Sequence, residues 1–184
     1  VALILGDNFF YGQSLSEKLK KASKLKNGAT IFAHPVKEIN RFGIVELNNN
    51  KIKNIKEKPK KSKSNLAITG LYFFDNSVIK KAFTLKKSKR NELEIIDLLN
   101  IYKRNKKLKV EHLGRGAAWL DAGTIKDFNQ TSIFVSSIEN RQGLKIACIE
   151  EISLLNKWIN KKDIFNSIKF YGNCDYSKYL RNLI

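Results

Sequence analysis

Short apolar runs broken by turn residues fill most of the first two thirds of the chain. Residues 1–5 are all apolar and run into Gly6-Asp7-Asn8, which predicts a buried parallel strand that ends in a tight turn. Ligands bind at the carboxyl ends of strands in open α/β sheets, so the carboxylate of Asp7 lies where we expect a site. Further strands are expected over residues 29–33, 44–47, 51–57, 66–74 and 108–113, and in a short run that ends at Asp121.

Apolar residues at helical spacing alternate with these strands and dominate the end of the chain. This spacing predicts helices over residues 14–24, 78–85, 93–102 and 124–140, then three short helices near residues 152–159, 163–168 and 177–184. Ser14 with Glu17 predicts a capping box on the first helix, and Thr124 is typical of an N-cap. We therefore expect an α/β domain over residues 1–138 and a helical C-terminal extension over residues 139–184.

Positive charge dominates the composition. Lys and Arg number 35 against 17 Asp and Glu, a formal net charge of +18, and seven of the thirteen residues from 51 to 63 are Lys. Clustered cations favour polyanionic partners such as nucleic acid. The excess is mostly Lys without interleaved aromatic residues for stacking on bases, which is typical of a solvated surface. A basic module that holds nucleic acid through residues 51–63 is an alternative interpretation, but nucleic acid is not the partner we expect.

Cysteine usage and the length of the apolar runs bear on location. Cys148 and Cys174 form no Cys-x-x-Cys pattern, so they indicate neither a zinc site nor a disulfide framework. No apolar run approaches the roughly 20 residues that span a bilayer. These features predict a cytoplasmic protein with no membrane partner. The chain has no Met and starts inside an expected strand, which indicates the C-terminal part of a longer protein.

Two acidic motifs, far apart in the sequence, carry the strongest functional signal. Taken alone, Gly6-Asp7-Asn8 is typical of a turn, because Asx side chains stabilise turns. However, the motifs in residues 5–12, 114–121 and 139–145 resemble those of the sugar-phosphate nucleotidyltransferases, in the same order and over nearly the whole chain. The resemblance implies the C-terminal portion of a Rossmann-like mixed sheet of the nucleotidyltransferase type.

The resemblance also implies a site. By it, Asp7 and Asp121 hold Mg²⁺, an ion that takes one or two carboxylates together with substrate phosphates. Lys58, in a Glu-Lys-Pro motif, would act with these aspartates as a catalytic residue that neutralises the sugar phosphate. The implied substrate-binding residues are Asn8, Gly43, Glu57, Lys58, Ile68, Tyr72 and Arg90. Each could instead be an ordinary packing or surface residue, and the joint match favours the functional interpretation.

The implied reaction is transfer of a nucleotidyl group from dTTP to glucose 1-phosphate, which gives dTDP-glucose and pyrophosphate. A UTP-dependent or other sugar-phosphate nucleotidyltransferase is the nearest alternative, and Arg141-Gln142-Gly143 in the helical tail favours the dTTP-dependent enzyme. The family resemblance further implies a homo-oligomer. The family's Gly-rich triphosphate loop does not occur in these 184 residues, so we expect the chain to be inactive by itself.

Several positions depart from the family pattern. Asn91 and Ile96 stand where Gly and Thr are usual, and Ala122 replaces the Thr that follows the metal-binding aspartate. The lost hydroxyls put local hydrogen bonds around the pocket in doubt. Leu155 stands in place of an Arg near the family's regulatory nucleotide site, which puts feedback inhibition by a deoxythymidine sugar nucleotide in doubt.

Overall fold

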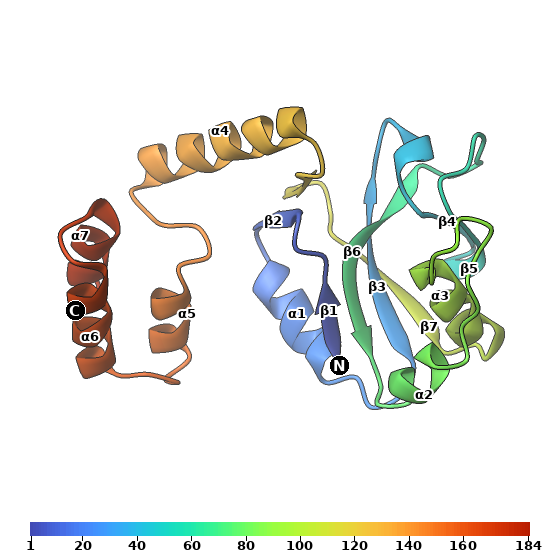
Figure 1. Cartoon of the computed structure of the whole chain (residues 1–184), viewed down its shortest axis with the longest axis horizontal. Helices are drawn as coiled ribbons and strands as arrows, with labels where there is room; N and C mark the ends of the chain where they lie inside the picture. Colours follow the sequence, from blue (N-terminus) through green and yellow to red (C-terminus); the bar gives the residue numbers. More distant parts are fainter. The chain divides into compact units, whose positions relative to one another are not determined.

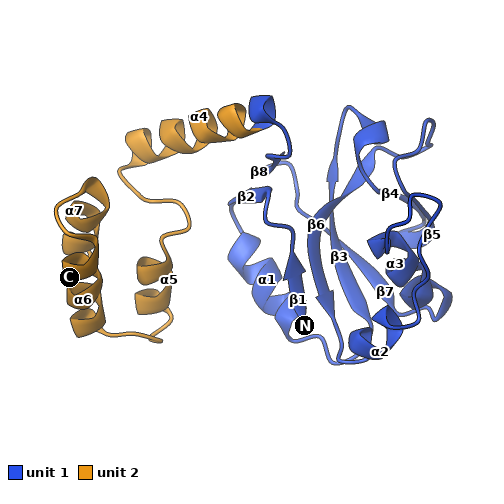
Figure 2. Cartoon of the chain, in the orientation of Figure 1, with its two compact units in different colours: residues 1–127 blue, residues 128–184 orange.

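The computed structural model describes residues 1–184 and divides into two compact units, Val1–Asp127 and Phe128–Ile184 (Figure 2). The first unit contains all the strands, and most of the second is helical. The mixed α/β architecture expected from the sequence is confirmed.

A mixed six-stranded sheet forms the centre of the first unit (Figure 1). Its strands are β1 (Ala2–Ile4), β3 (Ala29–Pro35), β4 (Ile44–Asn48), β5 (Lys51–Lys56), β6 (Leu66–Phe74) and β7 (Leu108–His112). The order β5-β4-β6-β3-β7 places β6 in the middle, and β1 pairs with the second half of β6. All pairs are antiparallel except β3 with β7, which is parallel. A separate ribbon joins β2 (Asn8–Gly12) to β8 (Ala117–Asp121).

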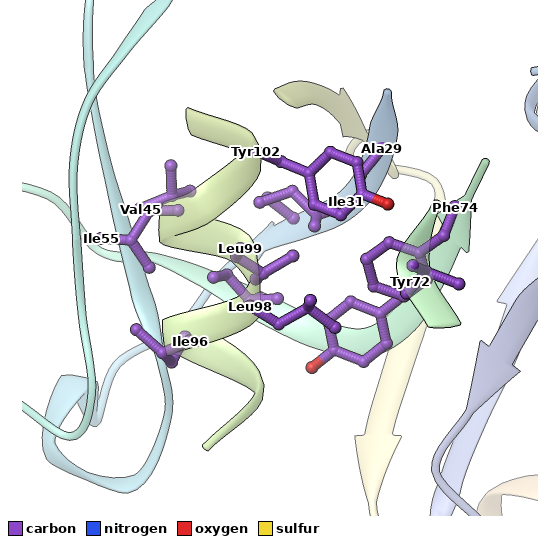
Figure 3. Close-up of a cluster of buried hydrophobic side chains, with 13 residues drawn as sticks. Ala29, Ile31, Val45, Ile55, Tyr72, Phe74, Ile96, Leu98, Leu99 and Tyr102 are labelled. Atoms are coloured by element: carbon purple, nitrogen blue, oxygen red, sulfur yellow. The ribbon is translucent and has the colours of Figure 1, made fainter. Parts of the chain in front are cut away.

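Both faces of the central strands are buried, because alternate side chains enter different cores. Tyr72 and Phe74 of β6 pack in a cluster with α3 (Ile95–Arg104), whose Leu99 and Tyr102 are fully buried (Figure 3). Leu71 of β6 belongs to a second cluster, against which apolar residues of α1 (Leu15–Ser23) pack. This arrangement explains why residues 66–74 form a near-continuous apolar run. The short α2 (Val78–Ala82) and the 3₁₀ turn η1 (Ile39–Arg41) complete the unit.

Two expectations about the start of the chain are wrong. β1 is exposed and pairs antiparallel with β6, whereas a buried parallel strand was expected. It has only one neighbouring strand, and Val1, Leu3 and Ile4 all remain exposed. Ser14 adopts a left-handed conformation at φ 60° and makes no side-chain cap, so the expected capping box is absent. In contrast, Thr124 caps its helix as expected, since its Oγ1 accepts a hydrogen bond from the Asp127 N–H at 3.1 Å.

The second unit is built from helices around its own small core. α4 (Ile125–Gln142) begins in the first unit, and α5 (Ile149–Leu155), α6 (Lys161–Tyr171) and α7 (Asp175–Arg181) follow. Its core consists of Cys148, Ile164, Ile168 and Leu180. Asn160 and Asp163 form a complete capping box at the start of α6. None of the helices combines the length and apolarity needed to cross a membrane.

Candidate functional site

The two aspartates singled out from the sequence lie side by side. The β2–β8 ribbon pairs Asn8 with Asp121, and the Ala122 N–H donates to the Asp7 carbonyl at 2.8 Å. The position that a Cβ on Gly123 would occupy is 3.4 Å from Asp121 Oδ1 and 3.6 Å from Asp7 Oδ2. The two carboxylate oxygens are therefore separated by no more than the sum of these distances. Asp7 and Asp121, which are 114 positions apart in the chain, thus lie next to each other at one end of the β2–β8 ribbon.

A pocket of about 220 Å³ opens beside these carboxylates. It is lined by Leu5, Asp7, Asn8, Arg41, Phe42, Gly43, Glu57, Lys58, Ile68, Gly70, Tyr72, Ile95, Ile96, Trp119 and Asp121. Every residue proposed for the site from the sequence is in this set except Arg90. These residues come from the turn before β2 and from β2, from η1 and the two residues after it, from the loop after β5, and from β6, β8 and the start of α3. The fold thus brings together segments that are distant in the sequence.

Two glycines leave the room that this pocket requires. Gly70 lies on β6 with φ +60°, and a Cβ there would approach the Asn8 side chain at 3.1 Å. A Cβ on Gly43 would lie 2.9 Å from Ile96 Cδ1 and 3.4 Å from Glu57 Oε2. A larger residue at Gly43 would consequently displace Ile96, and one at Gly70 would press on the Asn8 side chain.

Arg90 is held at the rim by carboxylates. Its guanidinium forms a bidentate pair with Glu94, with the shortest contact at 2.7 Å, and Nη2 lies 3.7 Å from Glu57 Oε1. Arg90 is therefore near the pocket but is bound to other side chains. Hydrogen bonds from Arg90 and Ser88 hold the pKa of Glu94 below its usual value.

Glu57 lines the pocket, where Asp7 and Asp121 are the other two carboxylates. Burial raises its pKa, and the charges of Lys58 and Arg90 partly oppose this effect. Burial, together with the charge on Glu57, raises the pKa of Tyr72 to about 12, so the phenol stays protonated and can donate a hydrogen bond. Lys58 has φ 38°, a conformation that non-glycine residues seldom adopt, so its backbone is strained at the position where it enters the pocket.

Asp7 is oriented by a relay of hydrogen bonds that begins at Trp119. The Trp119 Nε1–H donates to Asn8 Oδ1 at 2.6 Å, and Asn8 Nδ2 donates to Asp7 Oδ1 at 2.8 Å. The Trp119 ring also packs against Phe42, with ring centroids 5.0 Å apart. Sequence reasoning took Trp119 only as part of a motif and assigned it no role. Its alternation with Asp121 on β8 is the signal that could have placed it on the same face.

Asp121 is balanced between a like charge and a cation. Burial raises its pKa, Asp7 raises it further, and Arg41 opposes both. The Arg41 Nη2 lies 3.7 Å from Asp121 Oδ2 and 2.6 Å from Asp127 Oδ2. A hydrogen bond from Arg41 lowers the pKa of Asp127. Arg41 was not a candidate from the sequence, although it directly precedes Phe42-Gly43.

The donor set suits a hard divalent cation that keeps other ligands. Asp7 and Asp121 supply carboxylate oxygens at one edge of the pocket, and no group of three or more His, Cys, Asp or Glu side chains is placed to hold a metal. A cation bound there would need water or substrate oxygens to complete its shell, which is the manner in which Mg²⁺ binds beside phosphates. The residues present therefore fit such an ion.

Comparison with known proteins gives a consistent family. Residues 1–137 match the family model described as Nucleotidyl transferase. The chain belongs to the nucleotidyl transferase family. It is 47% identical over its full length to a glucose-1-phosphate thymidylyltransferase of Neisseria gonorrhoeae, and 40% identical to one of Mycobacterium tuberculosis. In both comparisons the chain covers 64% of the relative, so it spans less than two thirds of their length.

Solved structures agree with this membership. A crystal structure from Bacillus anthracis, described as a glucose-1-phosphate thymidylyltransferase in complex with a sucrose, matches with a TM-score of 0.64 and 34% identity. That match covers 72% of this chain and 53% of the other. A UDP-glucose pyrophosphorylase complexed with UDP-glucose shares the fold, with a TM-score of 0.63 at 21% identity over 74% of this chain and 55% of the other. The nucleotidyl transferase fold expected from the sequence is thus confirmed.

Proposed function

We propose that this chain is the sugar-phosphate and metal-binding part of a glucose-1-phosphate thymidylyltransferase, which transfers a nucleotidyl group from dTTP to glucose 1-phosphate and releases pyrophosphate. The observation that carries the proposal is the convergence of Asp7, Asp121, Glu57 and Lys58 on one pocket. The relatives at 40–47% identity support dTTP over UTP as the nucleotide. A UTP-dependent enzyme has only the support of a fold match at 21% identity.

Mg²⁺ is the cation that we propose for Asp7 and Asp121. When bound, it would neutralise charge on the phosphates and favour in-line attack on the α-phosphorus. Asn8, which Trp119 holds in place, donates a hydrogen bond to Asp7 Oδ1, so that Oδ2 would be the oxygen that ligates the cation. Arg41 supplies positive charge near Asp121, which reduces the repulsion between the two carboxylates before a cation binds.

The remaining pocket residues would hold the sugar phosphate. Glu57 accepts hydrogen bonds from sugar hydroxyls, and Tyr72 donates from the floor of the pocket. Gly43 allows the sugar to approach the backbone, while Lys58 offsets the phosphate charge. Reactions of this kind depend on positioning and charge stabilisation rather than on a protein nucleophile.

Arg90 would join the site only after a change of partner. In the structure its guanidinium is paired with Glu94, as described above, so a substrate phosphate must compete with that carboxylate. Arginine binds phosphate through the same two-pronged geometry that it uses for carboxylates, which makes the exchange chemically reasonable. We propose that Arg90 moves from Glu94 to the sugar phosphate.

We also propose the wider features that the sequence suggested. Residues 1–138 would form the sugar-phosphate and metal half, and residues 139–184 a helical extension. The extension exposes large apolar side chains, including Leu155, Trp158 and Phe170, which supports a homo-oligomer. A cytoplasmic location fits a site for nucleotides and sugar phosphates. A nucleic-acid module has no support from the family model or from the relatives, which are nucleotidyltransferases.

The test is pyrophosphate release by this chain completed with the remainder of a relative's sequence. The completed enzyme should turn over dTTP with glucose 1-phosphate and Mg²⁺, and Asp121→Asn should lower kcat by at least about a hundredfold. Asp97→Asn removes an exposed carboxylate outside the pocket and serves as the matched control. Full activity of Asp121→Asn, or turnover of UTP in preference to dTTP, would refute the corresponding part of the proposal.

A further inference from the structure

A second and larger hollow follows the outer edge of the sheet, away from the pocket described above. β7 is the last strand in the sheet order and pairs only with β3. Beside it lies a groove of about 1040 Å³, here called the β7 groove. It is lined by Lys18, Lys21, Ala22, Lys24, Leu25, Lys26, Asn27, Thr30, Asn50, Lys51, Ile52, Lys103, Lys106, Leu108, Lys109, Val110 and Glu111. The lining residues come from α1 and the loop after it, from α3 and the loop after it, from the β4–β5 turn and the start of β5, and from β3 and β7.

Unused main-chain groups of β7 face this groove. The Lys107 carbonyl accepts from the Ala29 N–H at 2.8 Å, and the Leu113 N–H donates to the Ala33 carbonyl at 3.1 Å. Because a parallel ladder uses every second residue, the odd-numbered residues of β7 point their main-chain groups towards β3. Leu108 and Val110 consequently present N–H and C=O groups outward. An edge of this kind is a template for an added strand.

The groove is strongly and unequally charged. Eight lysines line it against one carboxylate, Glu111, which pairs with Lys18 at 3.0 Å and Lys21 at 3.4 Å. The six others take part in no ion pair: Lys24, Lys26, Lys51, Lys103, Lys106 and Lys109. Lys18 also donates to the His112 carbonyl at 2.8 Å, which closes one end of the free edge. No hydrogen bond from outside the β3–β7 pair reaches the main chain of Leu108 or Val110, although β5 approaches β7 at this groove.

The non-charged lining distinguishes between classes of anion. Ala22, Leu25, Ile52, Leu108 and Val110 give the groove an apolar component, and no aromatic residue lines it. Without stacking surfaces, the groove lacks the feature by which proteins hold the bases of single-stranded nucleic acid. An extended peptide, in contrast, would use the outward main-chain groups and place alternate side chains on the apolar surface and near the lysines.

We propose that the β7 groove binds an acidic, extended segment of a partner protein, which pairs with β7 as an added strand. Charge complementarity selects the partner, because a carboxylate-rich chain offsets the six unpaired lysines. The same lysines exclude a second copy of this chain, whose own β7 edge is equally basic and whose net charge is +18. The inference does not depend on the nucleotidyl transfer proposed above.

The experiment uses a fluorescent acidic peptide in which Glu and Val alternate over eight residues. Its anisotropy is titrated with the full chain, and the expected binding weakens about tenfold between low and physiological salt, since exposed charges are screened. The same peptide with every backbone amide N-methylated keeps its charge but cannot donate a main-chain hydrogen bond to β7 from either edge. It should bind at least about tenfold more weakly, and equal binding would overturn the proposal.

Variants of the chain test the same two features. Lys106→Glu with Lys109→Glu should abolish binding, whereas Lys60→Glu with Lys61→Glu makes the same charge change on an exposed loop outside the groove and should weaken binding only slightly. Val110→Pro removes one outward N–H and no ladder bond, and edge strands tolerate proline. Val110→Pro should weaken binding of the unmethylated peptide and leave the weaker binding of the methylated peptide unchanged. If oligo-dT of the same charge bound as tightly as the acidic peptide, or more tightly, the proposal that the groove binds a peptide would be refuted.

Discussion

Gly43→Ala is the substitution for which the structure gives the most direct expectation. Gly43 precedes β4, and its backbone lies outside the left-handed region, so alanine is allowed there without backbone strain. The new methyl group would lie 2.9 Å from Ile96 Cδ1, shorter than real Cβ atoms tolerate, and 3.4 Å from Glu57 Oε2. Ile96 is 6% exposed and belongs to the main core, so it has little room to move.

The magnitude follows from two opposing effects. Inserting a methyl group into a packed core costs about 1–3 kcal/mol. Replacing glycine by alanine also lowers the conformational entropy of the unfolded chain, which stabilises the folded state by about 0.4–1 kcal/mol. We therefore expect the free energy of unfolding to fall by roughly 1–2 kcal/mol. Ile96→Val removes the clashing atom and by itself costs about 0.5–1.5 kcal/mol.

The assay is urea unfolding of Gly43→Ala, Ile96→Val and the double variant. Because the valine has no Cδ1, the double variant should be more stable than additivity predicts, by about 1 kcal/mol. Sites in direct contact commonly show coupling of this size, whereas independent sites add within about 0.5 kcal/mol. Additive costs in this cycle would show that Ile96 does not limit the space at Gly43, and the packing argument would fail.

Three further substitutions test other parts of the structure. Asp75→Asn should lower the free energy of unfolding by about 1–2 kcal/mol at pH 7: burial would raise the pKa of Asp75, but hydrogen bonds from three neighbouring residues hold it at about 2. This contribution is present above the unfolded pKa near 4 and is lost as pH falls towards 2, so identical acid unfolding of variant and wild type would contradict it. Trp119→Phe leaves the Asn8 amide oxygen without its donor and should weaken divalent-cation binding severalfold, which Mn²⁺ titration would detect. Gly70→Ala should cost about 1–3 kcal/mol in thermal or urea unfolding, because φ is +60° and the methyl group would press on Asn8; no change would refute the assigned geometry.

The hydrophobic pattern predicted the strands well, and particular residues show why. Residues 66–74 were expected as one central strand, and β6 covers that range. The run is apolar on both sides of Thr69-Gly70, and Tyr72 and Phe74 enter one core while Leu71 and Phe73 enter the other. Burial of this kind is recorded in the local sequence, so it can be read without knowing which strands are neighbours.

Features that depend on distant partners could not be predicted in the same way. The pattern of residues 1–5 shows a strand but does not show that it pairs antiparallel with β6 and has a single neighbour. Ser14 has the sequence of a capping box, yet its positive φ prevents the cap. Local composition carries no information on which conformation the turn before α1 adopts.

The candidate site likewise combines residues that could be identified from the sequence with residues whose role depends on distant contacts. Its residues were proposed from a family resemblance, and the structure places nearly all of them around one pocket. Arg41 and Trp119 were missed because their importance lies in contacts with Asp121 and Asn8, far away in the sequence. A single sequence shows residue types and spacing, whereas such contacts arise only after strands from opposite ends of the domain have met.

Direct measurement of divalent-cation binding by this chain tests the central claim most sharply. Mn²⁺ is titrated into the chain and followed by electron paramagnetic resonance, with Mg²⁺ as competitor and with Asp7→Asn, Asp121→Asn and the control Asp97→Asn. The account predicts one Mn²⁺ site that Mg²⁺ displaces, that each pocket variant weakens at least about tenfold, and that the control leaves unchanged. Unaltered Mn²⁺ affinity in both Asp7→Asn and Asp121→Asn would contradict it.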